Sequence, residues 1–238
     1  MIFMWKIREI KRQALFRLNG FMWKGVLVFV INLVILNLLT YILPAPNIDS
    51  MINYPEQTMK IISDNLGQFM TMYMTMLLGS LIINIFVGSP LEVGIRRFFQ
   101  EATEGNIKIS NIFFAFKNNY INIVKVMFIR NIVIELWSLL LIFPGVVKSF
   151  QLYFIPMQLA QNPNLTYKEA AKESKQMTNG DKLHIFGLNL SFIGWMLLGM
   201  VFAGVGVLLV YPYMYETDEM LYRHKKTDNT KEETIPEY

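Results

Sequence analysis

Long uncharged runs dominate this sequence, and they alternate with short segments that hold nearly all of the charges. The first run covers residues 25–43, and the second lies between Asp64 and Glu92. The longest covers residues 183–215 without a single Asp, Glu, Lys or Arg. A helix needs roughly 20 mostly apolar residues to cross a hydrocarbon core about 30 Å thick. The runs therefore predict an all-α fold, a polytopic transmembrane helical bundle.

The overall composition agrees with a chain that alternates between lipid and water. Hydrophobic residues make up 53% of the 238 positions and charged residues 17%, against about 25% charged residues in ordinary globular chains. The absence of cysteine excludes disulfides and thiolate metal sites. The net charge of +4 is better explained by cytoplasmic loops beside anionic lipid than by nucleic acid, which we do not expect as a partner.

We predict a single transmembrane domain over residues 1–225 and a disordered cytoplasmic tail over residues 226–238. The longest run would form a helix of about 50 Å at ~1.5 Å per residue, so we expect a turn within it. Gly199, Gly204 and Gly206 are the expected turn and helix-packing residues. The six predicted spans cover residues 24–43, 66–90, 124–143, 146–162, 183–201 and 204–222.

The basic residues predict the orientation. Every lysine and arginine except Lys60, Arg130 and Lys148 lies in the N-terminal segment, in the loops after the second and fourth spans, or in the tail. Because basic loops stay in the cytoplasm, both termini are expected there. Five spans would place the basic tail outside, so the charges favour a sixth span even though three acids (Glu216, Asp218 and Glu219) fall in its second half.

Three amphipathic segments are predicted outside the bilayer. Residues 2–22 form a basic amphipathic helix that would lie among anionic lipid headgroups, and residues 107–125 form an interfacial or bundle-capping helix. Residues 166–178 form a short cytoplasmic helix with a capping box at Thr166 and Glu169 and a C-terminal cap at Gly180. The apolar stripe of the first helix comprises Phe3, Ile7, Ile10, Ala14, Leu18 and Phe21.

Ionisable residues inside the predicted spans are the main functional candidates, because charges in a membrane are costly. Glu135 would lie near the midplane, held by an interhelical hydrogen bond or lining a proton or solute pathway. Arg130 would reach the cytoplasmic surface and Lys148 the outer surface. The possible partners of Glu135 are Asn84, Asn32 and Asn37.

A second polar group lies where the second predicted span leaves the bilayer. Glu92 precedes Arg96 by four residues, an orientation that favours a salt bridge, and Arg97 follows. We interpret these residues as an ion-paired cytoplasmic cap. The sequence has no Walker A, HExxH or GxSxG motif, so we predict no catalytic, cofactor or metal site and no enzyme activity.

Several ordered motifs resemble the bacterial membrane-protein family catalogued as domain of unknown function 975. The resemblance covers roughly residues 7–222 and implies six helices in a bacterial plasma membrane, without an established reaction. The architecture is also distantly similar to the membrane domain of some glycerophosphodiester phosphodiesterases, which is not the catalytic one. The motifs are Pro90-Leu91-Glu92-Val93-Gly94, Phe143-Pro144-Gly145-Val146-Val147-Lys148-Ser149, Asn162-Pro163-Asn164-Leu165, Leu190-Ser191-Phe192-Ile193-Gly194-Trp195 and Tyr211-Pro212-Tyr213.

The first hypothesis is a non-enzymatic multi-pass protein that works by interaction with membrane lipids and a possible membrane-protein partner, as an envelope or antimicrobial-resistance accessory factor. The alternative is a small transporter or channel with a polar midplane site around Glu135. A lipid-modifying enzyme would need convergent polar residues at headgroup level, and only Glu92 with Arg96 and Arg97 approaches that.

Overall fold

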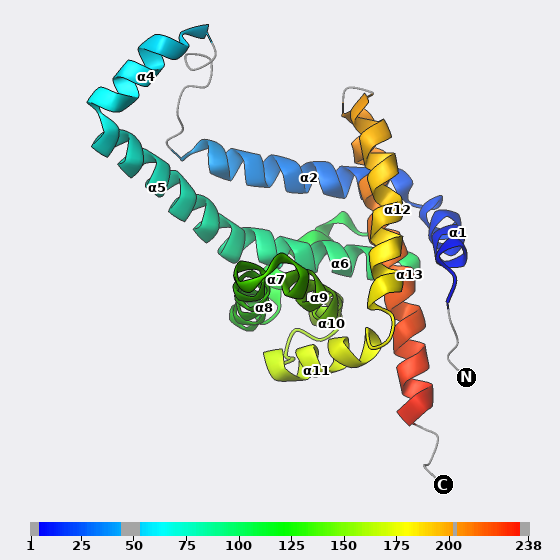
Figure 1. Cartoon of the computed structure of the whole chain (residues 1–238). Coiled ribbons are helices and arrows are strands. Elements are labelled where there is room, and N and C mark those ends of the chain that lie inside the picture. Colours follow the sequence, from blue (N-terminus) through cyan, green and yellow to red (C-terminus); the bar gives the residue numbers. More distant parts are fainter. Residues whose placement is uncertain (1–4, 44–52, 202–203, 234–238) are drawn as a thin grey trace. The chain divides into compact units, whose positions relative to one another are not determined.

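The computed structural model describes residues 5–43, 53–201 and 204–233, which contain helices and turns but no strand (Figure 1). The predicted all-α class is therefore confirmed for these residues. The helices are α1 (Ile7–Leu18), α2 (Met22–Tyr41), α4 (Pro55–Asp64), α5 (Leu66–Ile83), α6 (Ser89–Thr103), α7 (Phe114–Lys117), α8 (Tyr120–Leu140), α9 (Ile142–Gln151), α10 (Ile155–Gln161), α11 (Tyr167–Met177), α12 (Lys182–Val201) and α13 (Val205–Glu233).

The chain divides into two compact units, which are described separately. The smaller unit, Asn32–Gly88, holds the second half of α2, α4, α5 and a π-helical turn over Asn84–Gly88. None of the α5 side chains is buried in the protein. A Cβ on Gly79 would lie 3.3 Å or less from three side-chain atoms of Leu43, so glycine permits the close packing of these two residues.

The larger unit, Met1–Ile31 with Ser89–Tyr238, contains the hydrophobic core. One cluster joins α1, α12 and α13 through Ile10, Ala14 and Leu188. A second joins α8 with α10, and a third joins the start of α2 with α6. Since Ile10, Ala14, Leu18 and Phe21 are buried, the apolar stripe of α1 packs against protein, and its basic face is the one that points outward. Phe3 lies outside the described residues.

Two helical hairpins extend from this core. Leu141, in an extended conformation, separates α8 from α9, and the two helices pack closely because a Cβ on Gly145 would lie 2.6 Å from Ser138 Cα. Gly204 (φ 77°) precedes α13, and a Cβ on Gly199 would lie 2.7 Å from the Val207 nitrogen. The predicted turn and packing roles of the glycines between residues 199 and 206 are thus seen directly.

The exposed surface of the hairpin tips is apolar, whereas acidic side chains are buried in the core. At the α8–α9 tip the five residues 139–143 are each 67–82% exposed, and all are Leu, Ile or Phe. Val201 at the end of α12 is 79% exposed. By contrast, Glu216, Asp218 and Glu219 are at most 3% exposed. In the larger unit, apolar side chains face outward on the hairpins and charged ones are buried, which is the reverse of a water-soluble surface.

Three helices are long and apolar enough to cross a membrane: Met22–Tyr41, Leu66–Thr103 and Lys182–Val201. They coincide with the first, second and fifth predicted spans. The second predicted span ends at residue 90, whereas the helical segment continues through the π-helical turn and α6 to Thr103.

The fourth predicted span and the tail differ from the structure. Residues 146–162 are not one helix, because α9 ends at Gln151 and a turn leads into α10, whose residues Ile155–Ala160 are buried in the core. Residues 226–233, expected in a disordered tail, continue α13. At this end Lys226 hydrogen-bonds Gln161 of α10, and within α13 His224 lies 3.3 Å from Asp228.

The helix predicted over 166–178 is confirmed as α11, with the predicted capping box, and its cytoplasmic location stays a prediction. Thr166 N donates to the Glu169 carboxylate at 2.8 Å, and Glu169 N donates back to the Thr166 hydroxyl at 3.4 Å. Gly180 has φ 78°, which suits the chain reversal before α12. The amphipathic segment over 107–125 is instead a 3₁₀ turn (Ile109–Phe113), α7 and the first turn of α8, interrupted at Asn119 (φ 45°).

Candidate functional site

A buried ion pair between Arg96 of α6 and Asp218 of α13 lies at the centre of the larger unit. The two side chains are 2.9 Å apart and 11% and 4% exposed. The Tyr153 hydroxyl donates to the other Asp218 oxygen at 2.6 Å, and the Tyr215 ring lies 4.2 Å from the guanidinium carbon. Because a charge buried without a partner is strongly unfavourable, this pair fixes α13 against α6.

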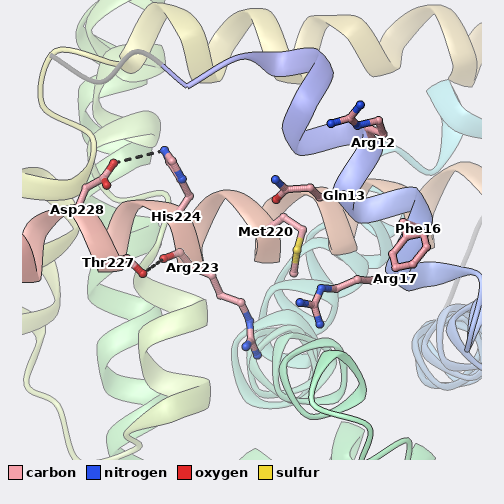
Figure 2. A pocket seen from close by; sticks show the side chains of 9 residues that line it. All are labelled: Arg12, Gln13, Phe16, Arg17, Met220, Arg223, His224, Thr227 and Asp228. Atoms are coloured by element: carbon pink, nitrogen blue, oxygen red, sulfur yellow. Dashed lines mark hydrogen bonds and ion pairs between the residues drawn. The ribbon is translucent and has the colours of Figure 1, made fainter.

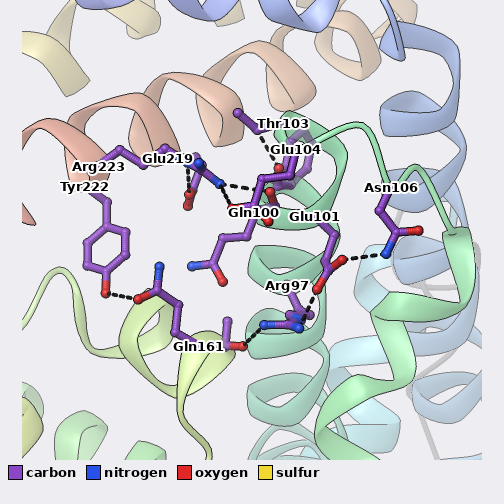
Figure 3. A network of polar contacts seen from close by, with 12 residues as sticks. Arg97, Gln100, Glu101, Thr103, Glu104, Asn106, Gln161, Glu219, Tyr222 and Arg223 are labelled. Atoms are coloured by element: carbon purple, nitrogen blue, oxygen red, sulfur yellow. Dashed lines mark hydrogen bonds and ion pairs between the residues drawn. The ribbon is translucent and has the colours of Figure 1, made fainter.

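Arg223 forms a second connection between the same helices, one turn further along α13 (Figure 3). It contacts Glu219 at 2.8 Å and Glu104 at 3.0 Å, and donates to the Gln100 carbonyl oxygen at 2.9 Å. Burial raises the pKa of Glu219 to about 7, although Arg223 opposes the rise. The arginine is therefore already satisfied by Glu219 of α13 and by Glu104, which directly follows α6.

Glu216 is fully buried beside Thr103 of α6, with both carboxylate oxygens 3.1–3.3 Å from the threonine hydroxyl. The same hydroxyl donates to the Phe99 carbonyl oxygen at 2.7 Å. Burial raises the pKa of Glu216 to about 8; Glu219 adds to the rise, while Thr103, Arg223 and Arg17 lower it. A hydroxyl has only one proton, so Thr103 can donate to only one of these two acceptors at a time.

Asp181, between α11 and α12, joins both ends of the chain to the core. Trp5 donates its ring N–H to Asp181 at 3.2 Å, and Lys225 of α13 pairs with the same carboxylate. Both charged side chains are 11% exposed. This contact explains why α13 continues as a helix through a sequence that is almost entirely polar.

The residues of the predicted cytoplasmic cap all form ion pairs, but with partners other than those predicted. Arg96 pairs with Asp218 rather than with Glu92, because its side chain turns into the core where a buried acid needs compensation. Arg97 pairs with Glu101 and donates to the Ala160 carbonyl oxygen at 3.1 Å. Glu92 lies 4.0 Å from Arg130 instead.

Arg130 and Lys148 occupy the base and the middle of the α8–α9 hairpin. Arg130 donates to the Leu152 carbonyl oxygen at 3.3 Å, which ties the two arms together at the core. Lys148 lines a cavity of about 370 Å³ together with Lys168, Lys172 and Lys175 of α11. Lys148 thus lies beside α11, and its reach to the outer surface stays a prediction.

The structure gives Glu135 no polar partner. It is exposed on α8 between apolar neighbours, and it makes no hydrogen bond or ion pair with any described residue. The proposed partners Asn84, Asn32 and Asn37 belong to the smaller unit, and Asn37 donates to the Leu33 carbonyl oxygen of its own helix. The interhelical hydrogen bond of Glu135 stays a prediction.

A cavity of about 740 Å³ separates α1 from the last turns of α13 (Figure 2). Arg12, Arg17, Arg223 and His224 give it a basic lining, and Asp228 supplies the acid. Arg223 and His224 already face acids, and Arg17 donates to the Thr103 carbonyl oxygen at 3.1 Å. Most of this basic charge is thus used within the protein.

Sequence reasoning missed the buried acids of α13 as the centre of the structure. Glu216, Asp218 and Glu219 were treated as the polar end of a membrane span. Their spacing carried a usable signal, because three acids within four residues directly after an apolar run are costly in lipid and need partners. Among the described residues no group of three or more metal-binding side chains comes together.

Comparison with known proteins supports one resemblance. No curated protein and no solved structure matches the chain, and the similarity to glycerophosphodiester phosphodiesterases stays a prediction. The matched family model is described as protein of unknown function DUF975, and its match covers α9 to most of α13. Residues 142–229 match this family model, which confirms the predicted resemblance over that range.

Proposed function

We propose that this chain is a non-enzymatic, multi-pass protein of a bacterial plasma membrane that acts by interaction, as an accessory factor of the envelope or of antimicrobial resistance. The observation that carries the proposal is the inverted surface of the larger unit, with apolar hairpin tips outside and charged pairs inside. Such hairpins are stable only when lipid or another apolar partner covers them.

The contacts at the base of each hairpin support a shallow insertion. From Arg130 to Leu140, and from Leu152 back to Ile142, each arm of the α8–α9 hairpin has ten residue steps, about 15 Å. The α12–α13 hairpin is anchored by Lys11, which donates to Ser191 at 2.9 Å, and Val201 is likewise about 15 Å away. Both distances are half of a ~30 Å hydrocarbon core.

In this arrangement α2 and α5 cross the bilayer, and both hairpins of the larger unit enter the cytoplasmic leaflet and return. The number of crossings stays even, so both termini remain in the cytoplasm, as the basic residues require. Four of the six predicted spans thereby become the arms of re-entrant hairpins. Within each arm the helix satisfies the polar backbone groups, which a lipid environment demands.

Cysteine labelling tests this topology, because the chain has no native cysteine. We expect Asn47→Cys to react with an impermeant thiol reagent in intact cells, and Leu141→Cys and Val201→Cys to stay unlabelled until the membrane is dissolved. Labelling of position 141 or 201 in intact cells would show that the corresponding hairpin crosses the membrane. Labelling in denaturing detergent is the control for reactivity.

A small transporter or channel is the second candidate, because Glu135 lies unpaired among apolar side chains. The two candidates are separated by purified protein in liposomes. An interaction factor leaves solute and proton flux at the level of empty vesicles, whereas a pathway through Glu135 gives flux that Glu135→Gln abolishes. Labelling of Glu135→Cys in permeabilised membranes would show that water reaches this position.

A further inference from the structure

The α11 helix presents an unneutralised basic face to the α8–α9 hairpin. Lys168, Lys172 and Lys175 follow one another at intervals of four and three residues, so they share one face of α11. Lys148 of α9 lies across the cavity of about 370 Å³ from them. Four positive charges from two elements thus surround one space.

The acids of α11 do not neutralise this face. Glu169 is held by Thr166 in the capping box, and Glu173 contributes to the electrostatic environment of Tyr222 on α13. Within the part of the chain that the structure describes, none of the four lysines pairs with a carboxylate, and no acid lines the cavity. The cavity therefore differs from the one beside α1, whose arginines are largely satisfied.

The position of the cavity beside the apolar hairpin favours an anion that carries a hydrocarbon chain over a free anion. Lys148 lies one turn from the hairpin base at Leu152, and the exposed apolar residues Ile142 and Phe143 lie one to two turns beyond it towards the tip. A ligand with a phosphate at the lysines and hydrocarbon along the hairpin would contact both surfaces. Tyr167 also lines this cavity.

We propose that Lys148, Lys168, Lys172 and Lys175 bind the phosphate of an anionic phospholipid, whose acyl chains lie along the α8–α9 hairpin. The inference rests on the proposed insertion of this hairpin in the cytoplasmic leaflet. Lysines suit this task because each is a compact charge that can meet a phosphate oxygen from any direction. Basic groups at a membrane surface each strengthen attraction to anionic lipid by about fivefold.

The test uses full-length protein in detergent micelles, titrated with dioleoylphosphatidylglycerol and followed by native mass spectrometry. The test variant is the triple change Lys168→Gln, Lys172→Gln and Lys175→Gln. The matched control removes three exposed lysines elsewhere: Lys108→Gln, Lys117→Gln and Lys125→Gln. The unfolding temperature without added lipid shows whether each variant folds.

We expect saturable binding of phosphatidylglycerol, weakened at least about tenfold in the test variant and unchanged in the control variant. Phosphatidylcholine should bind equally well to the test variant and to the control variant. Equal binding by the test variant and the parent, or equal losses in both variants, would overturn the inference. Inorganic phosphate that binds as tightly as the lipid would show a free-anion site instead.

A second variant keeps the test decisive if the triple change impairs folding. Lys148→Gln alone alters the opposite wall of the cavity, and we expect about fivefold weaker binding. Failure of the site is also distinguishable from failure of the membrane proposal. If the protein resists extraction by alkaline carbonate while Lys148→Gln binds phosphatidylglycerol as the parent does, the protein is membrane-embedded but this lipid site is wrong.

Discussion

Replacing Glu216 by glutamine tests whether the buried carboxyl group of α13 is protonated. Its oxygens lie 3.1–3.3 Å from the Thr103 hydroxyl, which also lies 2.7 Å from the Phe99 carbonyl oxygen. A glutamine amide oxygen can accept the same hydrogen bond from Thr103. Glutamine therefore preserves the hydrogen bond and the shape of the side chain while removing the ability to ionise.

The pH dependence of stability gives the size and sign of the effect. Burial raises the pKa of Glu216 from 4.5 to about 8, so between these values the folded protein binds a proton that the unfolded chain does not. The contribution to folding is fully present below pH 4.5 and is lost as the pH rises towards 8. Its slope is about 1.4 kcal/mol per pH unit. Glu219, with its pKa raised to about 7, adds a slope of the same sign.

The assay is thermal unfolding of the detergent-solubilised protein at several pH values between 5 and 8. We expect Glu216→Gln to match the parent near pH 5 and to become progressively more stable than the parent towards pH 8. Glu104→Gln is the control, because this acid is 64% exposed and should shift the unfolding temperature by a constant amount. A Glu216→Gln difference that does not change with pH would refute the protonated state.

Two further changes test the packing and the central ion pair. Gly94→Ala should lower the free energy of unfolding, measured by urea titration, by about 3 kcal/mol or more, since its Cβ would meet the Ile112 carbonyl oxygen at 1.8 Å. The control Gly187→Ala should be tolerated in the same assay, because the nearest neighbour of its Cβ lies at 3.6 Å. Arg96→Met should destabilise by about 3–5 kcal/mol because Asp218 is left buried and unpaired, and adding Asp218→Asn should restore part of the loss, as measured by a double-mutant cycle.

Local signals in the sequence predicted the elements that depend on local interactions. The capping box of α11 involves residues three positions apart, so Thr166 and Glu169 are sufficient to identify it. The glycines between residues 199 and 206 likewise mark a hairpin within one uncharged run. The apolar helices α2 and α12 follow from length and hydropathy alone.

Long-range pairing could not be read in the same way. Glu92 and Arg96 have the spacing of a helical salt bridge, yet Arg96 pairs with an acid 122 positions away. The local pair is worth about 0.5 kcal/mol at most, whereas an unpaired buried Asp218 would cost several times more. The stronger requirement determines the rotamer, and only the tertiary structure reveals it. The same reasoning applies to Lys225 and Asp181, which keep α13 helical beyond its apolar part.

Hydropathy counts apolar residues without regard to what covers them, and this explains why residues 146–162 were predicted to form one span. Most of residues 152–160 are as apolar as a membrane span, but they are buried by protein and lie beside Arg97 and Gln100, which donate to the Ala160 and Met157 carbonyl oxygens. A core that holds several buried ion pairs gains nothing from entering hydrocarbon. In the proposed arrangement, the depth of insertion is set by the distance from the last charged contact to each hairpin tip, about 15 Å in both cases. Arg130 and Lys11, rather than the ends of the apolar runs, define the proposed membrane boundary of the larger unit.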